Sequence, residues 1–254
     1  MIISVINHTN GKITDVALQH AIRAINRQIE EDFAPYWSLG ATLRLEGRSS
    51  KTPGKQSLAD LRGDAILYLW DKVDVEDALG YHDSNNRGIP YGFVFTELAK
   101  QLKESWTVTL SHEALELIGD PEVNLLVVGP HPSNPKADVF FWYELCDAVQ
   151  AETYKIDGIE VSNFLLPLYF TSGDETGGRN DFLGQVHNGK TLHSFGVNPG
   201  GYIGYFNPAT GEHETFAQRG DKKAAQRLAI KQKAKGTRRS VRYQRISARG
   251  KNAI

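Results

Sequence analysis

One short segment of the chain combines three ionisable side chains at helical spacing. Residues 111–121 read SHEALELIGDP, and within them His112, Glu113 and Glu116 form an H-E-x-x-E sequence. In an α-helix, positions 112 and 116 lie one turn apart on the same face, so an imidazole and a carboxylate can bind one metal ion together. Glu113 then lies beside that ion, where it can take a proton from water as a general base. The spacing therefore predicts a metal site that activates water.

The positions around this motif are mostly apolar. They are Trp106, Val108, Leu110, Leu115, Leu117 and Ile118. A buried carboxylate without a partner is costly, so His112, Glu113 and Glu116 in such company require a compensating group, and a metal ion provides one. The alternative interpretation is a chance match on a solvated helix face. Because Glu116 makes the ligand set harder and more negative, we expect Zn²⁺ and consider Mn²⁺ and Ca²⁺ compatible as well.

Apolar periodicity predicts the elements that must position the motif. Leu18, Ile22 and Ile25 recur at helical spacing, and we expect Thr14 to cap a helix that ends near residue 32. Strands of the sheet that this helix covers are predicted at residues 2–6, 41–45 and 65–70.

An edge hairpin is expected next, followed by the motif helix over residues 107–119. Residues 79–81 and 91–95 are short extended segments, and the glycine- and asparagine-containing segment 82–88 between them predicts a loop. His82 lies in that loop and has no spacing to other residues that indicates a site.

The net charge of −1 conceals an acidic body and a basic C-terminal segment. Residues 219–254 contain 13 Lys and Arg residues against Asp221 alone, a formal charge of +12, whereas the preceding 16 basic and 29 acidic residues give −13. Such a segment is suited to nucleic acid or an acidic protein surface. It could equally fold over its own acidic body or form a solvated helix.

Composition predicts one domain, residues 1–218, followed by a basic tail, residues 219–254, that is helical or disordered. The single cysteine, Cys146, excludes an intrachain disulfide and is compatible with a reducing compartment. We find neither a signal peptide at the N-terminus nor an apolar run of membrane-spanning length. We therefore expect a cytoplasmic protein without a membrane partner.

The order of these elements resembles the N-terminal half of zincin-type metallopeptidases, over about residues 1–122. The motif differs by one residue from the H-E-x-x-H signature of that family, with Glu116 at the second histidine. The resemblance implies an α+β fold with a zincin-like mixed sheet, a backing helix and an active-site helix, here with a basic tail. It also implies hydrolysis of an amide in a peptide or protein substrate. The chain is similar, too, to uncharacterised proteins of bacteria and their phages that carry Ser-His-Glu-x-Leu-Glu and Glu-x-Cys-Asp segments, which implies no activity.

The resemblance leaves the third metal ligand open. Zincins with a glutamate ligand place it on a later element that returns to the site, which makes Glu144 and Asp147, in the sequence YELCD, the distant candidates. In a strand these positions point to opposite faces, so both can bind only if a turn intervenes. The alternatives are a salt bridge for Glu144 and a helix cap for Asp147.

Asp120 is a candidate closer to the motif. It can bind the ion, orient His112, or form the turn before Pro121. In families with an extended motif a glycine and a third ligand follow the helix, and Gly119 and Glu122 occupy those offsets. Tyr154 and Tyr202 could donate to an oxyanion, although we favour packing with a hydrogen-bonded hydroxyl.

Two functions are compatible with the sequence. The first is a metal-dependent hydrolase, a peptidase by resemblance, in which Glu113 is the base. The second is a non-catalytic, virion- or capsid-associated protein that binds nucleic acid or an acidic surface through residues 219–254.

Overall fold

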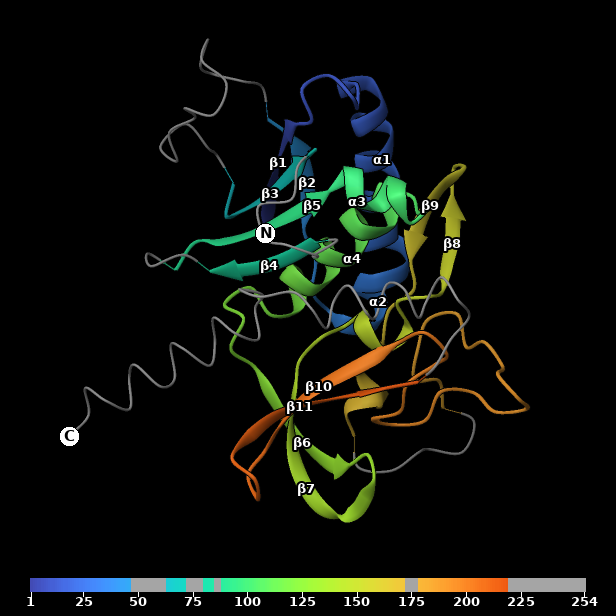
Figure 1. Cartoon of the computed structure of the whole chain (residues 1–254). Coiled ribbons are helices and arrows are strands. Elements are labelled where there is room, and N and C mark those ends of the chain that lie inside the picture. The colour runs from blue at the N-terminus through green and yellow to red at the C-terminus, as the bar shows by residue number, and fades with distance from the viewer. Residues whose placement is uncertain (47–62, 72–79, 85–87, 172–177, 219–254) are drawn as a thin grey trace, which may run out of the picture.

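The computed structural model describes residues 1–46, 63–71, 80–84, 88–171 and 178–218 (Figure 1). The helices are α1 (Asp15–Arg27), α2 (Ala34–Trp37), α3 (Thr96–Gln101) and α4 (Trp106–Gly119), with shorter helical segments η1 (Gln28–Phe33), η3 (Asp147–Val149) and η4 (Pro167–Phe170). The strands are β1 (Ile2–His8), β2 (Thr42–Leu45), β3 (Ala65–Trp70), β4 (Gly80–Ser84), β5 (Pro90–Phe95), β6 (Leu126–His131), β7 (Asn134–Trp142), β8 (Thr153–Ile156), β9 (Ile159–Ser162), β10 (Tyr202–Asn207) and β11 (Glu212–Ala217). The predicted α+β class is confirmed.

Two sheets and a separate hairpin form the body. Sheet A has the order β2-β1-β3-β5-β4 among the described residues, and sheet B has the order β11-β10-β7-β6. In sheet A, β1, β2, β3 and β5 run parallel, whereas the edge strand β4 is antiparallel to β5, so the sheet is mixed. The β8–β9 hairpin lies apart from both sheets, across α4 from sheet A (Figure 1).

The long first helix begins where the sequence predicts. The hydroxyl of Thr14 accepts a hydrogen bond from the amide of Ala17 over 3.1 Å, which satisfies one of the free N–H groups at the start of α1. Beyond Arg27 the helix continues as the π-helical segment η1. Apolar residues of α1, α4 and sheet A share one buried core, as a helix that backs a sheet requires.

The motif helix α4 is buried from Thr107 to Gly119. It contacts β3, β4 and β5 of sheet A and, on another side, β9 of the hairpin (Figure 1). This position explains why its sequence is apolar around most of its circumference. Its ionisable residues therefore lie in the interior of the protein.

Polar contacts in the core fix α4 against its neighbours. The hydroxyl of Ser111 donates to Oε1 of Gln28 over 2.6 Å and accepts from the amide of Ser162 over 3.1 Å. The side-chain amide of Gln28 donates in turn to the carbonyl of Ser162 over 2.8 Å. All three residues are buried, and these bonds therefore join η1 and β9 to α4 at the position of Ser111.

The loop predicted for residues 82–88 is wrong at its start. Strand β4 continues through His82 to Ser84, and His82 pairs with Gly92 of β5. The backbone hydrogen bonds between β4 and β5 stabilise the strand despite the turn-forming composition of the segment. Local propensity alone does not predict such a pairing. As a result His82 is held on the edge strand next to α4.

The chain turns after β7, so Glu144 and Asp147 do not lie on one strand. Strand β7 ends at Trp142, and the amide of Glu144 donates to the carbonyl of Trp142 over 2.9 Å. The chain then enters η3 at Asp147. Glu144 and Asp147 can bind one ion together only if a turn lies between them, and the structure has such a turn.

The predicted tail, residues 219–254, lies outside the described residues, and the division at residue 218 stays a prediction. Within the described part of the chain, no helix has both the length and the apolar character needed to cross a membrane.

Candidate metal centre

The motif histidine, the motif glutamate and one of the distant carboxylates converge in the structure. The Nε2 atom of His112 lies 3.3 Å from Oε1 of Glu116 and 3.3 Å from Oδ1 of Asp147. Their relative exposures are 7%, 3% and 4%. One face of α4 and the start of η3 thus present three possible ligand atoms to one buried point.

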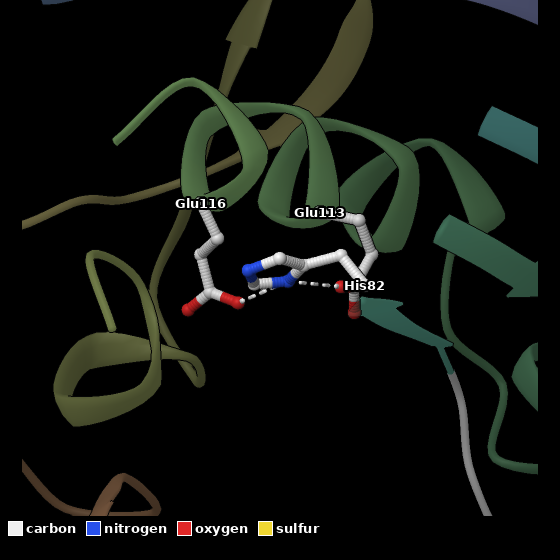
Figure 2. A group of neighbouring side chains, drawn as sticks. All are labelled: His82, Glu113 and Glu116. Atoms are coloured by element: carbon white, nitrogen blue, oxygen red, sulfur yellow. Dashed lines mark hydrogen bonds and ion pairs between the residues drawn. The ribbon is translucent and has the colours of Figure 1, made fainter. Parts of the chain in front are cut away.

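A second group, drawn in Figure 2, consists of His82, Glu113 and Glu116 and so shares Glu116 with the first. The Nδ1 atom of His82 lies 3.3 Å from Oε2 of Glu113 and 3.5 Å from Oε2 of Glu116. Figure 2 shows the imidazole of His82 reaching from β4 to the two carboxylates that hang from α4. The sequence predicts a loop at His82 and assigns it no role. A strand predicted to extend from residues 79–81 as far as Ser84 would have placed this histidine beside the motif helix.

The spacing within the first group fits a metal ion better than hydrogen bonds. Two ligands of a tetrahedral zinc ion lie about 3.4 Å apart when each bond is about 2.1 Å long. A charge-assisted hydrogen bond between nitrogen and a carboxylate is about 2.7–2.9 Å long, and a ring nitrogen has one hydrogen for one good acceptor. His112 instead places one nitrogen 3.3 Å from each of two carboxylates.

Another histidine in the same molecule provides the comparison. The Nε2 atom of His187 lies 2.7 Å from Oε1 of Glu152, whose side chain is buried. This is the length of an ordinary imidazole–carboxylate hydrogen bond. The contacts of His112 are longer than this hydrogen bond, and they involve two carboxylates instead of one.

Two glycines allow the surrounding backbone to approach the centre. A Cβ atom on Gly80 would lie 2.7 Å from Oε1 of Glu113 and 2.8 Å from the carbonyl oxygen of Phe93. A Cβ atom on Gly201 would lie 2.5 Å from the carbonyl carbon of Ala148 and 3.0 Å from the carbonyl oxygen of Asp147. These approaches are too close for a real Cβ, so only glycine fits at the start of β4 and at the position just before β10.

The residues beside the ligands hold them in place. The amide of Cys146 donates to Oε1 of Glu116 over 3.2 Å, and the side chain of Tyr202 hydrogen-bonds to Asp147. Burial raises the pKa of the Tyr202 phenol well above its ordinary value, and the nearby Asp147 carboxylate adds to that effect. The neutral phenol is therefore a stable donor to Asp147.

Cys146 does not act as a nucleophile in this arrangement. Its side chain is fully buried, and its thiol contacts the carbonyl oxygen of His112 over 3.8 Å. Burial raises the pKa of the thiol well above its usual value, and the Glu116 and Asp147 carboxylates raise it further. The reactive thiolate is thus disfavoured.

Several other candidates have different contacts. The two carboxylate oxygens of Asp120 accept hydrogen bonds from the amides of Asn124 and Leu125 over 3.0 and 3.1 Å, as the turn alternative predicts. Glu144 is half-buried, and neither it nor Asp120 belongs to the ligand groups found among the described residues.

Two residues considered from the family likeness also lie elsewhere. Glu122 is exposed, and its carboxylate accepts from the side chain of Asn124 over 3.0 Å. The hydroxyl of Tyr154 donates to Oδ2 of Asp32 over 2.7 Å, which is the packing arrangement that we favoured for it.

Comparisons with protein-family models, curated proteins and solved structures found no match to this chain. The zincin likeness therefore remains a prediction, and the function must be argued from the buried histidines and carboxylates themselves.

Proposed function

We propose that the protein is a metal-dependent hydrolase that cleaves an amide bond in a peptide or protein substrate. The observation that carries this proposal is the convergence of His112, Glu116 and Asp147 at separations suited to a divalent cation. Zn²⁺ fits the mixture of one imidazole and two carboxylates, and the same set accommodates Mn²⁺. The choice of a peptide substrate rests on the family resemblance of the motif.

A bound cation would polarise the scissile carbonyl and lower the pKa of water. The residues of the chain would bind the ion and orient its ligands. His112, Glu116 and Asp147 hold the ion, and Tyr202 and the Cys146 amide orient two of these ligands.

Glu113 is the proton acceptor in this proposal. It follows His112 directly on α4, and its Oε2 atom lies 3.3 Å from Nδ1 of His82. That contact keeps the carboxylate on the side of α4 where the ligands lie. A proton taken from the attacking water by Glu113 can then be delivered to the leaving amine.

Metal content tests the binding part of the proposal. Protein purified without chelator and loaded with Zn²⁺ should retain metal through gel filtration, as measured by inductively coupled plasma mass spectrometry. The double variant His112→Ala/Glu116→Ala should lose it. The variant His20→Ala/Glu30→Ala is a matched control because it removes the same residue types from exposed positions. Unchanged metal content in the first variant would end this proposal.

Hydrolysis is tested separately with Glu113→Gln. This change keeps the size of the side chain and removes its basicity, so the ion bound by His112, Glu116 and Asp147 should stay. Cleavage of a fluorogenic peptide library should fall by about 10²-fold or more, the usual contribution of a general base. A rate equal to that of the wild type would remove Glu113 from its role.

A further inference from the structure

The two oxygens of the Glu116 carboxylate face different histidines. Oε1 lies 3.3 Å from Nε2 of His112, whereas Oε2 lies 3.5 Å from Nδ1 of His82. A carboxylate whose oxygens engage separate ligand groups is arranged as a bridge, the geometry that joins the ions of two-metal sites about 3.5–4 Å apart. Glu116 is thus shared by two groups rather than committed to one.

The His82 group has the composition and burial of a binding position in its own right. His82, Glu113 and Glu116 have relative exposures of 1%, 4% and 3%, and their ligand atoms all lie within 4.8 Å of one another. They come from two elements, β4 and α4, whose close approach depends on Gly80. Both the pairing of β4 with β5 and this glycine bring the histidine to the carboxylates.

The contacts of His82 follow the same pattern as those of His112. Its Nδ1 atom lies 3.3 and 3.5 Å from oxygens of two different carboxylates, Glu113 and Glu116. One N–H group points to one acceptor and forms a bond near 2.8 Å when that acceptor is charged. The contact to Glu113 is a long hydrogen bond, and both distances are close to the separation of about 3.4 Å between two ligands of one tetrahedral ion.

Charge is compatible with a second cation, since the three buried carboxylates Glu113, Glu116 and Asp147 leave a formal charge of −1 with one divalent ion and +1 with two. Two carboxylates, Glu116 and Asp147, neutralise one divalent ion in the first group, and Glu113 adds a third buried carboxylate beside them. Negative charge in the interior is stabilised by a cation close to it, and an ion coordinated by Glu113 and the neutral imidazole of His82 provides that stabilisation.

We infer that the centre takes a second divalent cation, held by His82, Glu113 and Glu116, with Glu116 bridging the two ions. This inference rests on the proposed function, since the first ion is the one held by His112, Glu116 and Asp147. The first group is the better organised one because Tyr202 holds Asp147, which belongs to that group alone, whereas the Cys146 amide holds Glu116, which both groups share. It therefore fills first as the metal concentration rises.

Filling the second position has a consequence for activity. A second ion held by His82 and Glu113 would coordinate the same carboxylate that acts as the proton acceptor in the one-ion form, whose Oε2 atom lies 3.3 Å from Nδ1 of His82. A carboxylate whose oxygen coordinates a cation is a far weaker base, because protonation then competes with the metal. The two-ion form is consequently the inhibited state, and the second position regulates the enzyme by metal availability.

Metal stoichiometry of the full-length protein tests the second position. The wild type, His82→Gln and the exposed-histidine control His20→Gln are each titrated with Zn²⁺ against a chromophoric chelator. We expect about two equivalents for the wild type and the control and about one for His82→Gln. Activity of the wild type should rise with the first equivalent and fall with the second by about 10-fold or more. The rate of His82→Gln is compared with its own value at one equivalent, and it should not fall when more Zn²⁺ is added.

A measurement on the wild type alone covers the case in which His82→Gln does not fold. Mn²⁺ is added in steps and followed by electron paramagnetic resonance, where two ions joined by a carboxylate give an exchange-coupled spectrum and a single ion does not. The coupled spectrum should appear only above one equivalent.

The outcomes separate the two proposals. One equivalent in the wild type, unchanged by His82→Gln and without coupling, overturns the second position and leaves the proposed function standing. No bound metal overturns both. Two equivalents retained by His82→Gln overturn the assignment of His82, and activity that grows with the second equivalent overturns the inhibitory role.

Discussion

The backbone amide of Cys146 donates a hydrogen bond to Oε1 of Glu116 over 3.2 Å, and so ties the turn after β7 to the buried face of α4. The next residue along the chain is Asp147, whose carboxylate lies 3.3 Å from His112. This bond therefore fixes the relative positions of Glu116 and Asp147, two candidate ligands that are far apart in the sequence. Because the donor is a backbone group, the relationship is best disturbed through a neighbouring backbone contact.

Gly201→Ala should disturb the position of Asp147 relative to Glu116. The added Cβ would lie 2.5 Å from the carbonyl carbon of Ala148, so η3 and Asp147 must shift. We expect Zn²⁺ affinity to fall by about 10-fold or more, the usual cost of disturbing groups that orient metal ligands. Competition with a chromophoric chelator measures this. Gly40→Ala is the control, since a Cβ there would contact nothing within 4 Å, and equal affinities in the two variants would contradict the prediction.

Asp147→Asn and Asp120→Asn should have different effects, although both replace a buried aspartate. Asp147→Asn removes an anionic ligand, so metal affinity should fall by about 10-fold or more. Asp120→Asn disrupts the hydrogen bonds to the Asn124 and Leu125 amides, and should cost about 1–3 kcal/mol of unfolding free energy while the metal stays bound. Metal analysis and thermal unfolding distinguish the two, and a metal-free Asp120→Asn protein would make Asp120 a ligand after all.

The parts of the fold that follow from local sequence were predictable. The continuous apolar run of β3 has the predicted bounds, Ala65–Trp70, because a strand buried in the middle of a sheet tolerates few polar residues. Thr14 caps α1 as expected, because its hydroxyl needs only the amide of Ala17 three residues on. The motif helix α4 starts one residue earlier than predicted and ends at Gly119.

The candidate centre was predictable only where its residues are close in sequence. His112 and Glu116 follow from helical spacing, whereas His82 depends on the pairing of β4 with β5, a contact whose register no local pattern specifies. The choice between Glu144 and Asp147 likewise needed the turn after Trp142. The zincin likeness concerns the order of elements, and no comparison bears on it.

Removal of metal should destabilise the folded protein. An ion that binds the native state and not the unfolded chain stabilises it by about 2.7 kcal/mol when its free concentration is about 100 times its dissociation constant. Adding EDTA should therefore lower the Tm by about 5–10 °C for a domain of this size, and excess Zn²⁺ should restore it. The double variant His112→Ala/Glu116→Ala should not respond to EDTA. The same Tm shift in that variant would place the stabilising ion elsewhere.

The basic segment 219–254 makes a prediction that is independent of the metal centre. If it binds nucleic acid, affinity for duplex DNA should fall steeply with salt, because each Lys or Arg that neutralises a phosphate releases a counterion. Fluorescence anisotropy from about 50 to about 300 mM salt should show a steep slope for the full chain and a much shallower one for residues 1–218.

A variant of unchanged length separates charge from the mere presence of the segment. Replacing Arg238, Arg239, Arg242, Arg245, Arg249 and Lys251 by Gln removes six of its 13 basic residues and should reduce the slope in proportion to the number of phosphates that these side chains neutralise. Weak binding that is equal in the full chain, the Gln variant and residues 1–218 would exclude nucleic acid as the partner. Because the body carries a formal charge of −13, that result would favour a segment that contacts its own acidic surface, which salt-dependent proteolysis of residues 219–254 would then reveal.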